Sequence, residues 1–171
     1  MKLDLEIFEV YEQFYLGELD KESAFEKIKS YIESDIADDL RVKCVNYIGK
    51  LGLENDVCYK FLENLLISDS SEGVRFESVK IILRDFLNRG MDAIKWSLEH
   101  DLSPNSVYFI IKDLRVHEEI DMRLILYEVF QNLIRNKYKG SEHTNVKFYI
   151  SENFKNSTFT TYKNQIFYKL R

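Results

Sequence analysis

The residues best suited to catalysis or metal binding in this sequence are three histidines, each of which adjoins a glutamate. The pairs are Glu99-His100, His117-Glu118 and Glu142-His143. Imidazole and carboxylate groups are common ligands of iron and other transition metals. The pairs do not share one order, and solvated polar residues at helix ends are the better interpretation, so we expect no metal site.

Other catalytic patterns do not occur in the sequence. It has no glycine-rich phosphate loop, no Gly-x-Ser-x-Gly and no His-Glu-x-x-His, and scattered serines, histidines and aspartates do not define a triad. The only cysteines, Cys44 and Cys58, lack metal or disulfide-framework spacing and are expected to be small core residues. We therefore expect a protein that is not an enzyme and has no cofactor.

The elements that would position any site are predicted to be helices. Proline and glycine are scarce, and apolar residues recur at helical spacing over most of residues 3–138. The first helix is expected near residues 3–16 and stops near Gly17, and the second begins after Asp20, whose side chain suits an N-cap. These two helices are expected to form an antiparallel hairpin.

An internal repeat is the most informative feature of the sequence. Arg41 and Arg75 hold the same place in two copies of one segment, 34 residues apart. Each copy follows an acidic turn and precedes a second amphipathic helix, expected at residues 55–67 and 91–99. A period of 34 made of two helices is typical of an α-solenoid, in which helix pairs stack to bury a continuous core.

These two units resemble HEAT repeats. The first helix of a HEAT repeat typically carries an acidic turn, a hydrophobic-Arg pair and a small residue three positions later. Here the matching residues are Leu40-Arg41 with Cys44, and Val74-Arg75 with Ser78. The resemblance covers residues 34–101 and implies a mainly α fold, a HEAT-like α-α superhelix of antiparallel helix hairpins.

The resemblance also implies a role for the two repeated arginines. In HEAT-like proteins an arginine at this place usually pairs with acidic turn residues of adjacent repeats, for which Asp39 and Glu72 are candidates. Arg41 and Arg75 are therefore expected to be structural rather than anion ligands. A third, altered unit starts near residue 103, and its long partner helix at 118–137 is expected to cap the repeats.

Two enzyme families are built on HEAT-like repeats, and the sequence fits neither. Deoxyhypusine hydroxylase is an iron enzyme that needs several His-Glu pairs at repeat-equivalent positions, and only His117-Glu118 has that order here. The alkylpurine DNA glycosylases use basic, aromatic-lined surfaces. Residues 135–171 carry eight basic and two acidic residues and therefore have a net charge of +6. Because the whole chain has a net charge of −5, residues 1–134 have a net charge of −11. This negative charge disfavours binding of nucleic acid by the helical repeats.

The remaining expectations concern the ends of the chain. No apolar run approaches the roughly 20 residues of a membrane span, and the acidic start is unlike a signal peptide, so we expect a cytoplasmic protein without membrane insertion.

Alternating apolar residues over 146–150, and a run rich in Thr, Phe, Tyr and Ile over 158–170, predict two or three short strands. The expected domains are 1–139, the HEAT-like body, and 140–171, a basic aromatic appendage packed on it as a β-hairpin or small sheet. Some archaeal leucine-rich-repeat proteins begin with a similar helical segment.

The predicted architecture gives the body a binding face for another protein. Second helices of a solenoid line its concave side, and four residues on the second helices point away from the expected core: Tyr59, Glu63, Asp92 and Trp96. The only tryptophan, Trp96, is a candidate hot spot, or it packs against the capping helices. We expect a protein-protein interaction scaffold that uses this face.

The basic C-terminal segment, residues 135–171, offers an alternative function. Its eight aromatic residues alternate with lysines, and such a surface binds single-stranded nucleic acid or an anionic surface. The candidate residues are Lys147, Tyr149, Lys155 and Lys163. The favoured interpretation of the same composition is a sheet docked on the helices with its lysines in water, and an uncovered edge strand would pair with a second copy to form a homodimer.

Overall fold

The structure is a computed structural model, and it describes residues 2–34, 36–100, 106, 109 and 110. Six helices occupy this part of the chain: α1 (Lys2–Tyr15), α2 (Lys21–Glu33), α3 (Asp38–Leu51), α4 (Asp56–Ser68), α5 (Glu72–Asp85) and α6 (Leu87–His100). The predicted mainly α fold is confirmed for these residues. The chain divides into two units, Met1–Glu118 and Glu119–Arg171, and all six helices belong to the first. The capping helix at 118–137, the predicted strands and the boundary at residue 139 lie outside the described residues.

Local signals in the sequence fix where several helices begin and end. Asp20 caps α2 as predicted, because its carboxylate accepts hydrogen bonds from the Ser23 backbone N–H at 2.7 Å and from the Ser23 hydroxyl at 2.8 Å. Asn55 caps α4 in the same way. Gly17 follows α1 with φ +75°, and Gly52 ends α3 with φ +61°, the left-handed conformation that glycine adopts without steric cost.

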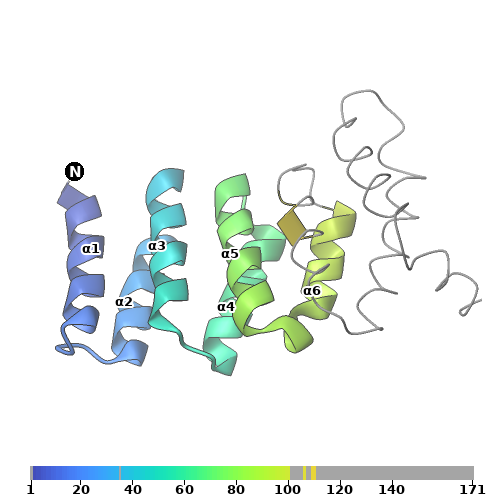
Figure 1. Ribbon diagram of the computed structural model, residues 1–171. Coiled ribbons are helices and arrows are strands. Elements are labelled where there is room, and N and C mark those ends of the chain that lie inside the picture. The colour runs from blue at the N-terminus through green and yellow to red at the C-terminus, as the bar shows by residue number, and fades with distance from the viewer. Residues whose placement is uncertain (1, 35, 101–105, 107–108, 111–171) are drawn as a thin grey trace, which may run out of the picture. The chain divides into compact units, whose positions relative to one another are not determined.

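The helices lie in two layers. Figure 1 shows α1, α3 and α5 next to one another, with α2, α4 and α6 behind them. We call the first set the odd layer and the second set the even layer. The core between the layers receives large, fully buried side chains from all six helices: Ile7, Phe25, Ile28, Ile48, Leu51, Leu62, Leu66, Ile82, Leu83, Ile94 and Leu98. Burial of these side chains supplies the main driving force for the fold.

The repeat places equivalent residues in equivalent surroundings. Cys44 on α3 and Ser78 on α5 are both fully buried, and the Ser78 hydroxyl donates to the Val74 carbonyl at 2.8 Å. Burial raises the pKa of the Cys44 and Cys58 thiols to about 12. Both thiols are therefore protonated at neutral pH, and the expectation that they are small core residues is confirmed.

The predicted start of the sixth helix, residue 91, is four residues too late. Only Phe86 separates α5 from α6, and the Gly90 backbone N–H donates to the Phe86 carbonyl at 2.7 Å within the first turn of α6. A Cβ added at Gly90 would overlap the Cγ2 methyl of Ile82. Glycine thus lets α6 fold back closely on α5, whereas in the sequence it suggests a break.

Candidate partner-binding surfaces

The residues predicted to bind a partner on α4 and α6 do not form one exposed face. Tyr59 is only 6% exposed. Its hydroxyl donates its one proton to the Glu63 carboxylate at 2.6 Å, and the Arg89 carbonyl oxygen lies 3.2 Å from the same hydroxyl. The predicted exposure of Tyr59 is therefore wrong. The buried stripe of α4 centres on Leu62, which turns Tyr59 inward and leaves Phe61 half-buried.

Tyr59 instead belongs to a contact between α4 and α6. The Arg89 guanidinium lies 4.3 Å from the centre of its ring and pairs with Asp56 at 2.7 Å. The pKa of Tyr59 is raised to about 12, first by burial and then by its hydrogen bond to Glu63. At neutral pH Tyr59 is a neutral donor whose main effect is to hold the two helices together.

The other residues of this predicted surface remain accessible. Asp92 is exposed, and Glu63 and Trp96 are half-buried. The Trp96 ring stacks on His100 at a centroid distance of 4.6 Å and an angle of 13°. A partner can reach Glu63, Asp92 and Trp96, but not the ring of Tyr59.

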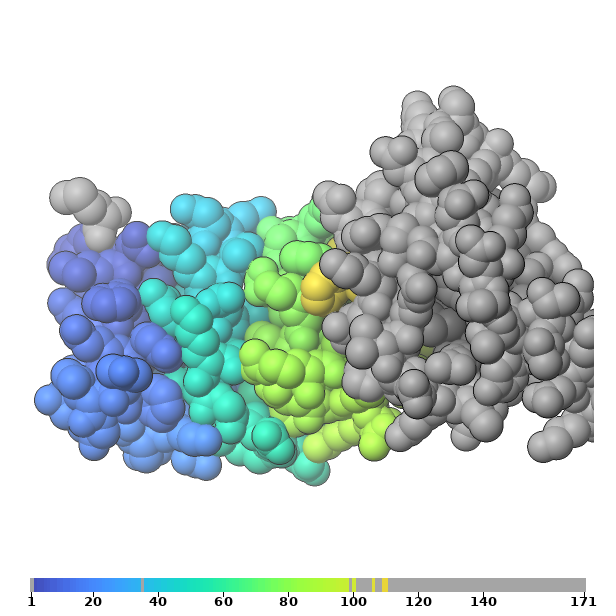
Figure 2. All heavy atoms as spheres, viewed as in Figure 1, coloured from blue at the N-terminus to red at the C-terminus, as the bar shows by residue number. Residues whose placement is uncertain are grey.

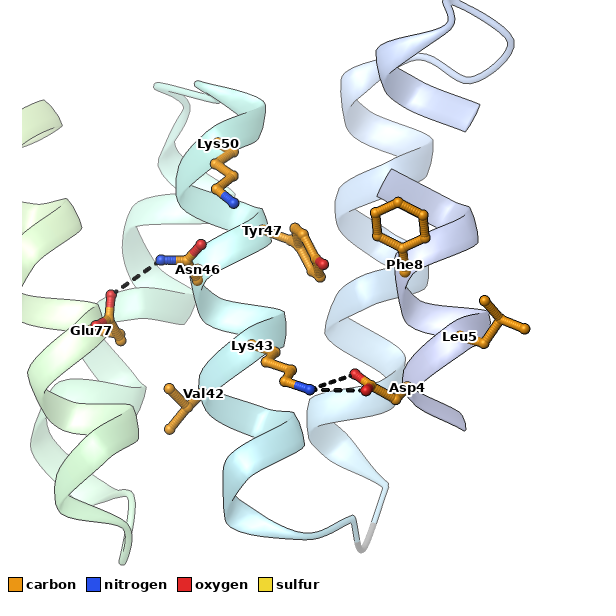
Figure 3. A pocket seen from close by; sticks show the side chains of 9 residues that line it. All are labelled: Asp4, Leu5, Phe8, Val42, Lys43, Asn46, Tyr47, Lys50 and Glu77. Atoms are coloured by element: carbon orange, nitrogen blue, oxygen red, sulfur yellow. Dashed lines mark hydrogen bonds and ion pairs between the residues drawn. The ribbon is translucent and has the colours of Figure 1, made fainter. Parts of the chain in front are cut away.

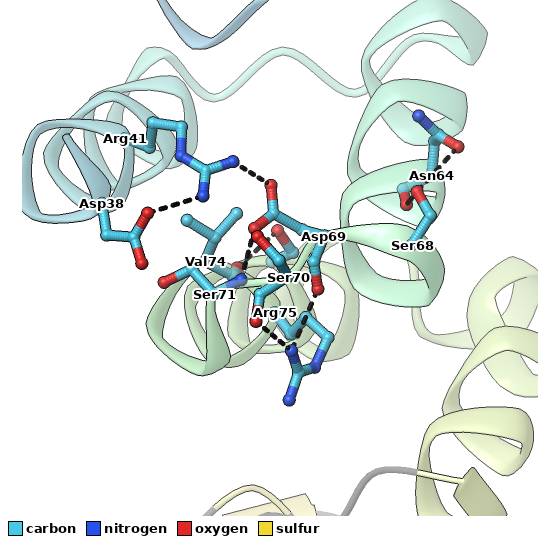
Figure 4. A network of polar contacts seen from close by, with 10 residues as sticks. Asp38, Arg41, Asn64, Ser68, Asp69, Ser70, Ser71, Val74 and Arg75 are labelled. Carbon is cyan, nitrogen blue, oxygen red and sulfur yellow. Dashed lines mark hydrogen bonds and ion pairs between the residues drawn. The ribbon is translucent and has the colours of Figure 1, made fainter. Parts of the chain in front are cut away.

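Arg41 and Arg75 meet at the turn that joins α4 to α5, shown in Figure 4. Arg41 donates to the Asp69 carboxylate at 2.7 Å and to the Asp38 carboxylate at 2.8 Å. Arg75 donates to the backbone carbonyls of Asp69 and Ser70 at 2.9 and 3.0 Å. The carboxylate that Arg41 reaches in the next turn is Asp69, whereas the suggested Asp39 is exposed.

This network joins one helix pair to the next. The Asp69 side chain is only 5% exposed and Arg41 is 17% exposed. The pKa of Arg41 is raised by its hydrogen bond to Asp38, and burial acts in the opposite direction. Both arginines satisfy groups of the protein itself, which is the behaviour expected of structural residues rather than of a site for an external anion.

A groove that the sequence analysis did not predict lies on the odd layer. Its volume is about 610 Å³, and its lining comes from α1, α3 and α5: Asp4, Leu5, Phe8, Val42, Lys43, Asn46, Tyr47, Lys50 and Glu77. The face that carries it is turned toward the viewer in Figure 2. Figure 3 shows Phe8 of α1 and Tyr47 of α3 on opposite walls, with the Asp4–Lys43 pair between the two helices.

The groove exists because neighbouring helices of the odd layer approach each other to different extents. Between α3 and α5 the contact is made on glycines: a Cβ at Gly49 would lie 2.8 Å from Ile81, and one at Gly73 would lie 2.9 Å from Val42. Between α1 and α3 the contact is made by two large rings, since Tyr11 and Tyr47 stack at 4.7 Å. Stacked rings hold α1 away from α3, and the space beside them stays open.

Charges on the groove are largely paired. Lys43 bonds the Asp4 carboxylate at 2.8 and 2.9 Å, and the Glu77 carboxylate accepts from Lys80 at 2.9 Å. The Lys50 ammonium lies 5.1 Å from the centre of the Tyr47 ring and, among the described residues, has no carboxylate partner. The groove is thus an apolar and aromatic surface on which, within the part of the chain that the structure describes, the Lys50 ammonium contacts aromatic rings rather than a carboxylate.

A signal for this site was present in the sequence, though a weak one. The first helix carries apolar residues on more than one side, and Leu5, Phe8 and Tyr15 do not fit the stripe that is buried around Ile7 and Val10. Apolar residues outside the core stripe of a helix mark a second contact surface.

The predicted nucleic-acid residues Lys147, Tyr149, Lys155 and Lys163 lie outside the described residues. Within residues 2–34, 36–100, 106, 109 and 110, no group of three or more His, Cys, Asp or Glu side chains could hold a metal ion. None of the helices described is long and apolar enough to cross a membrane. Comparisons with protein-family models, curated proteins and solved structures found no match to this chain.

Proposed function

We propose that the chain is a non-catalytic protein-binding scaffold made of HEAT-like helix pairs, and that the groove on the odd layer receives part of the partner. The observation that carries the proposal is the groove itself, in which the exposed Phe8 of α1 stands opposite the aromatic wall at Tyr47 and Leu5 borders the opening. Two layers of successive helices, joined across the repeat by Arg41 and Asp69, are the arrangement that stacked HEAT-like hairpins require.

The chemistry of the lining supports a protein partner. Specific interfaces combine an apolar, aromatic centre with a polar rim, and here Phe8 and Tyr47 are flanked by the Asp4–Lys43 pair and by Asn46. Removal of apolar surface from water yields about 25 cal/mol per Å². Seating one aliphatic or aromatic side chain between Phe8 and Tyr47 therefore contributes on the order of 1 to 2 kcal/mol to binding.

A second part of the partner contact is proposed on the even layer. Glu63, Asp92 and Trp96 are accessible there, and a partly exposed tryptophan contributes much area at low entropic cost. Tyr59 is left out of this contact because it is buried.

The test of the groove uses site-specific photo-cross-linking of the full chain in cells of its natural source. A photoreactive amino acid replaces Asn46, which lines the groove, and a matched protein carries it at Glu22, an exposed position on α2 outside both proposed contacts. We expect one protein to be cross-linked from position 46 and not from position 22. Binding of that protein, once purified, should weaken about tenfold with Phe8→Ala.

Two results would contradict the proposal. Equal cross-linking from positions 46 and 22 would show that the groove is not favoured over ordinary surface. An identified partner whose dissociation constant is unchanged by Phe8→Ala would place the contact elsewhere.

A further inference from the structure

The first helix has two apolar faces, and only one of them is used by the fold. Ile7 and Val10 are buried against the other helices. On another side of α1 and its following turn, large apolar residues remain in water, with exposed fractions of 57% for Leu5, 43% for Phe8, 77% for Tyr15 and 63% for Leu16. We call these four residues the outer seam.

The outer seam has the spacing that contacts another helix. Leu5, Phe8, Glu12 and Tyr15 follow one another at intervals of three, four and three residues, which places them in one row along α1. The seam continues directly into the groove, because Leu5 and Phe8 also line it. A helix laid along α1 would therefore cover the seam and insert side chains between Phe8 and Tyr47.

The charge around the seam selects the occupant. Residues 2–20 carry six acidic residues and one basic residue, a net charge of −5. The one basic residue, Lys2, pairs with Glu6 at 3.7 Å. Glu9 and Glu12 are exposed and, among the described residues, have no basic partner. A helix that covers the seam would meet Glu9 on one of its flanks, whereas Glu12 stands within the row itself, between Phe8 and Tyr15.

The opposite flank of the same helix would meet a different charge. It would lie over α3, where Lys43 is paired with Asp4 and the Lys50 ammonium is held over Tyr11 and Tyr47. The Lys50 ammonium would repel positive charge on that flank of the bound helix. We therefore expect the bound helix to carry its positive charge only on the flank that faces α1. A second copy of this chain fits poorly, because two surfaces with a charge of −5 would face each other.

We propose that the outer seam and the adjoining groove bind an amphipathic helix of a partner protein, with lysines or arginines on the flank that faces Glu9. Its apolar stripe packs on Leu5, Phe8 and Tyr15, and its flank over Lys50 is uncharged or acidic. This inference rests on the proposed function and adds the chemical class of the partner segment.

The test uses the full chain and two synthetic helical peptides of about 18 residues, long enough to cover α1. Both carry leucines at helical seam spacing and glutamines on one flank; the other flank is lysine and arginine in the first peptide and glutamate in the second. Fluorescence anisotropy should show binding of the basic peptide and little binding of the acidic one. Phe8→Ala should weaken binding of the basic peptide about tenfold, whereas Val57→Ala, at an exposed valine on α4, should leave it unchanged.

Salt and charge variants complete the test. Glu9→Gln should weaken the basic peptide about threefold and reduce the loss of affinity between low and physiological salt, because exposed charges are screened by ions. Equal binding of both peptides, or an affinity insensitive to Phe8→Ala, would overturn the inference, and so would a failure of both peptides to bind. The cross-link from position 46 is measured independently, so a wrong partner class and a wrong binding groove give different results.

Discussion

Replacing Asp69 with asparagine should destabilise the helical body, because this carboxylate joins two helix pairs from a buried position. It accepts a hydrogen bond from Arg41 at 2.7 Å and another from the Ser71 backbone N–H at 2.8 Å. Asparagine has nearly the same shape but no charge. The substitution therefore removes the ion pair and creates no large cavity.

The expected loss of unfolding free energy depends on which hydrogen-bond partners Arg41 retains in the variant. Its Nε has no hydrogen-bond partner among the described residues and is buried, and without Asp69 the guanidinium retains the exposed Asp38. Removing one partner of a buried pair costs about 3 to 5 kcal/mol, and a hydrogen bond to a charged group contributes about 1.5 to 3 kcal/mol. Because Asp38 and the asparagine amide oxygen both still accept from Arg41, we expect a loss of about 2 kcal/mol.

The assay is urea unfolding of the full chain followed by far-ultraviolet circular dichroism, with Asp38→Asn as the matched control. Both substitutions remove one carboxylate from the same arginine, but Asp38 is exposed and its loss should change the unfolding free energy little. The reasoning fails if the two variants are equally stable, or if Asp69→Asn lies within about 0.5 kcal/mol of the wild type. In either case Arg41 would not be a structural link between the helix pairs.

Two further predictions concern the packed interior. Gly90→Ala should lower the unfolding free energy by about 1 to 2 kcal/mol, despite the better helix propensity of alanine, because the new methyl group would overlap Ile82. The control is Asn88→Ala, at an exposed position of the same helix. In the same urea assay this control variant should not be destabilised. The folded-state pKa of Cys44 and of Cys58, about 12, lies above the value of roughly 8.5 for an unfolded thiol. The stability that this difference supplies is complete below about pH 8.5 and is lost as pH rises toward 12. Urea midpoints between pH 8 and 10 should therefore fall more steeply in the wild type than in a variant with alanine at both cysteines, and parallel slopes would contradict this.

The helices could be predicted from local signals, and their packing could not. The Asp20 cap and the helical spacing of apolar residues act within one or two turns of helix, so the sequence contains what is needed to find α1 and α2. The choice between Tyr59 and Phe61 depends on neighbours. Tyr59, three residues before Leu62, lies nearer the buried stripe than Phe61, which directly precedes Leu62. Polarity favours burying Phe61, but Glu63 and the Arg89 carbonyl provide partners for the Tyr59 hydroxyl. Since those partners include another helix, the sequence of α4 alone does not show that the Tyr59 hydroxyl can be buried.

The groove was unpredictable for a similar reason. Its width depends on how closely α1, α3 and α5 approach, and that depends on Gly49 facing Ile81 in one contact and Tyr11 facing Tyr47 in the other. A repeat pattern read along the sequence treats these two contacts as equivalent. Only their pairing across helices shows that one closes on a glycine and the other stays open beside two stacked rings.

Stability and binding are assigned to different residues of the odd layer, and this separation is what makes the proposed site testable. Arg41 and Asp69 tie the helix pairs together from partly buried positions, whereas Leu5 and Phe8 expose about half of their surface and contribute correspondingly less to the core. A surface residue that leaves few buried contacts behind changes the unfolding free energy by less than about 1 kcal/mol when it is truncated. Phe8→Ala should therefore keep the urea midpoint close to that of the wild type while it weakens the partner. If Phe8→Ala instead lowered the urea midpoint as much as Asp69→Asn does, Phe8 would be a core residue. The outer seam would then not be a binding surface.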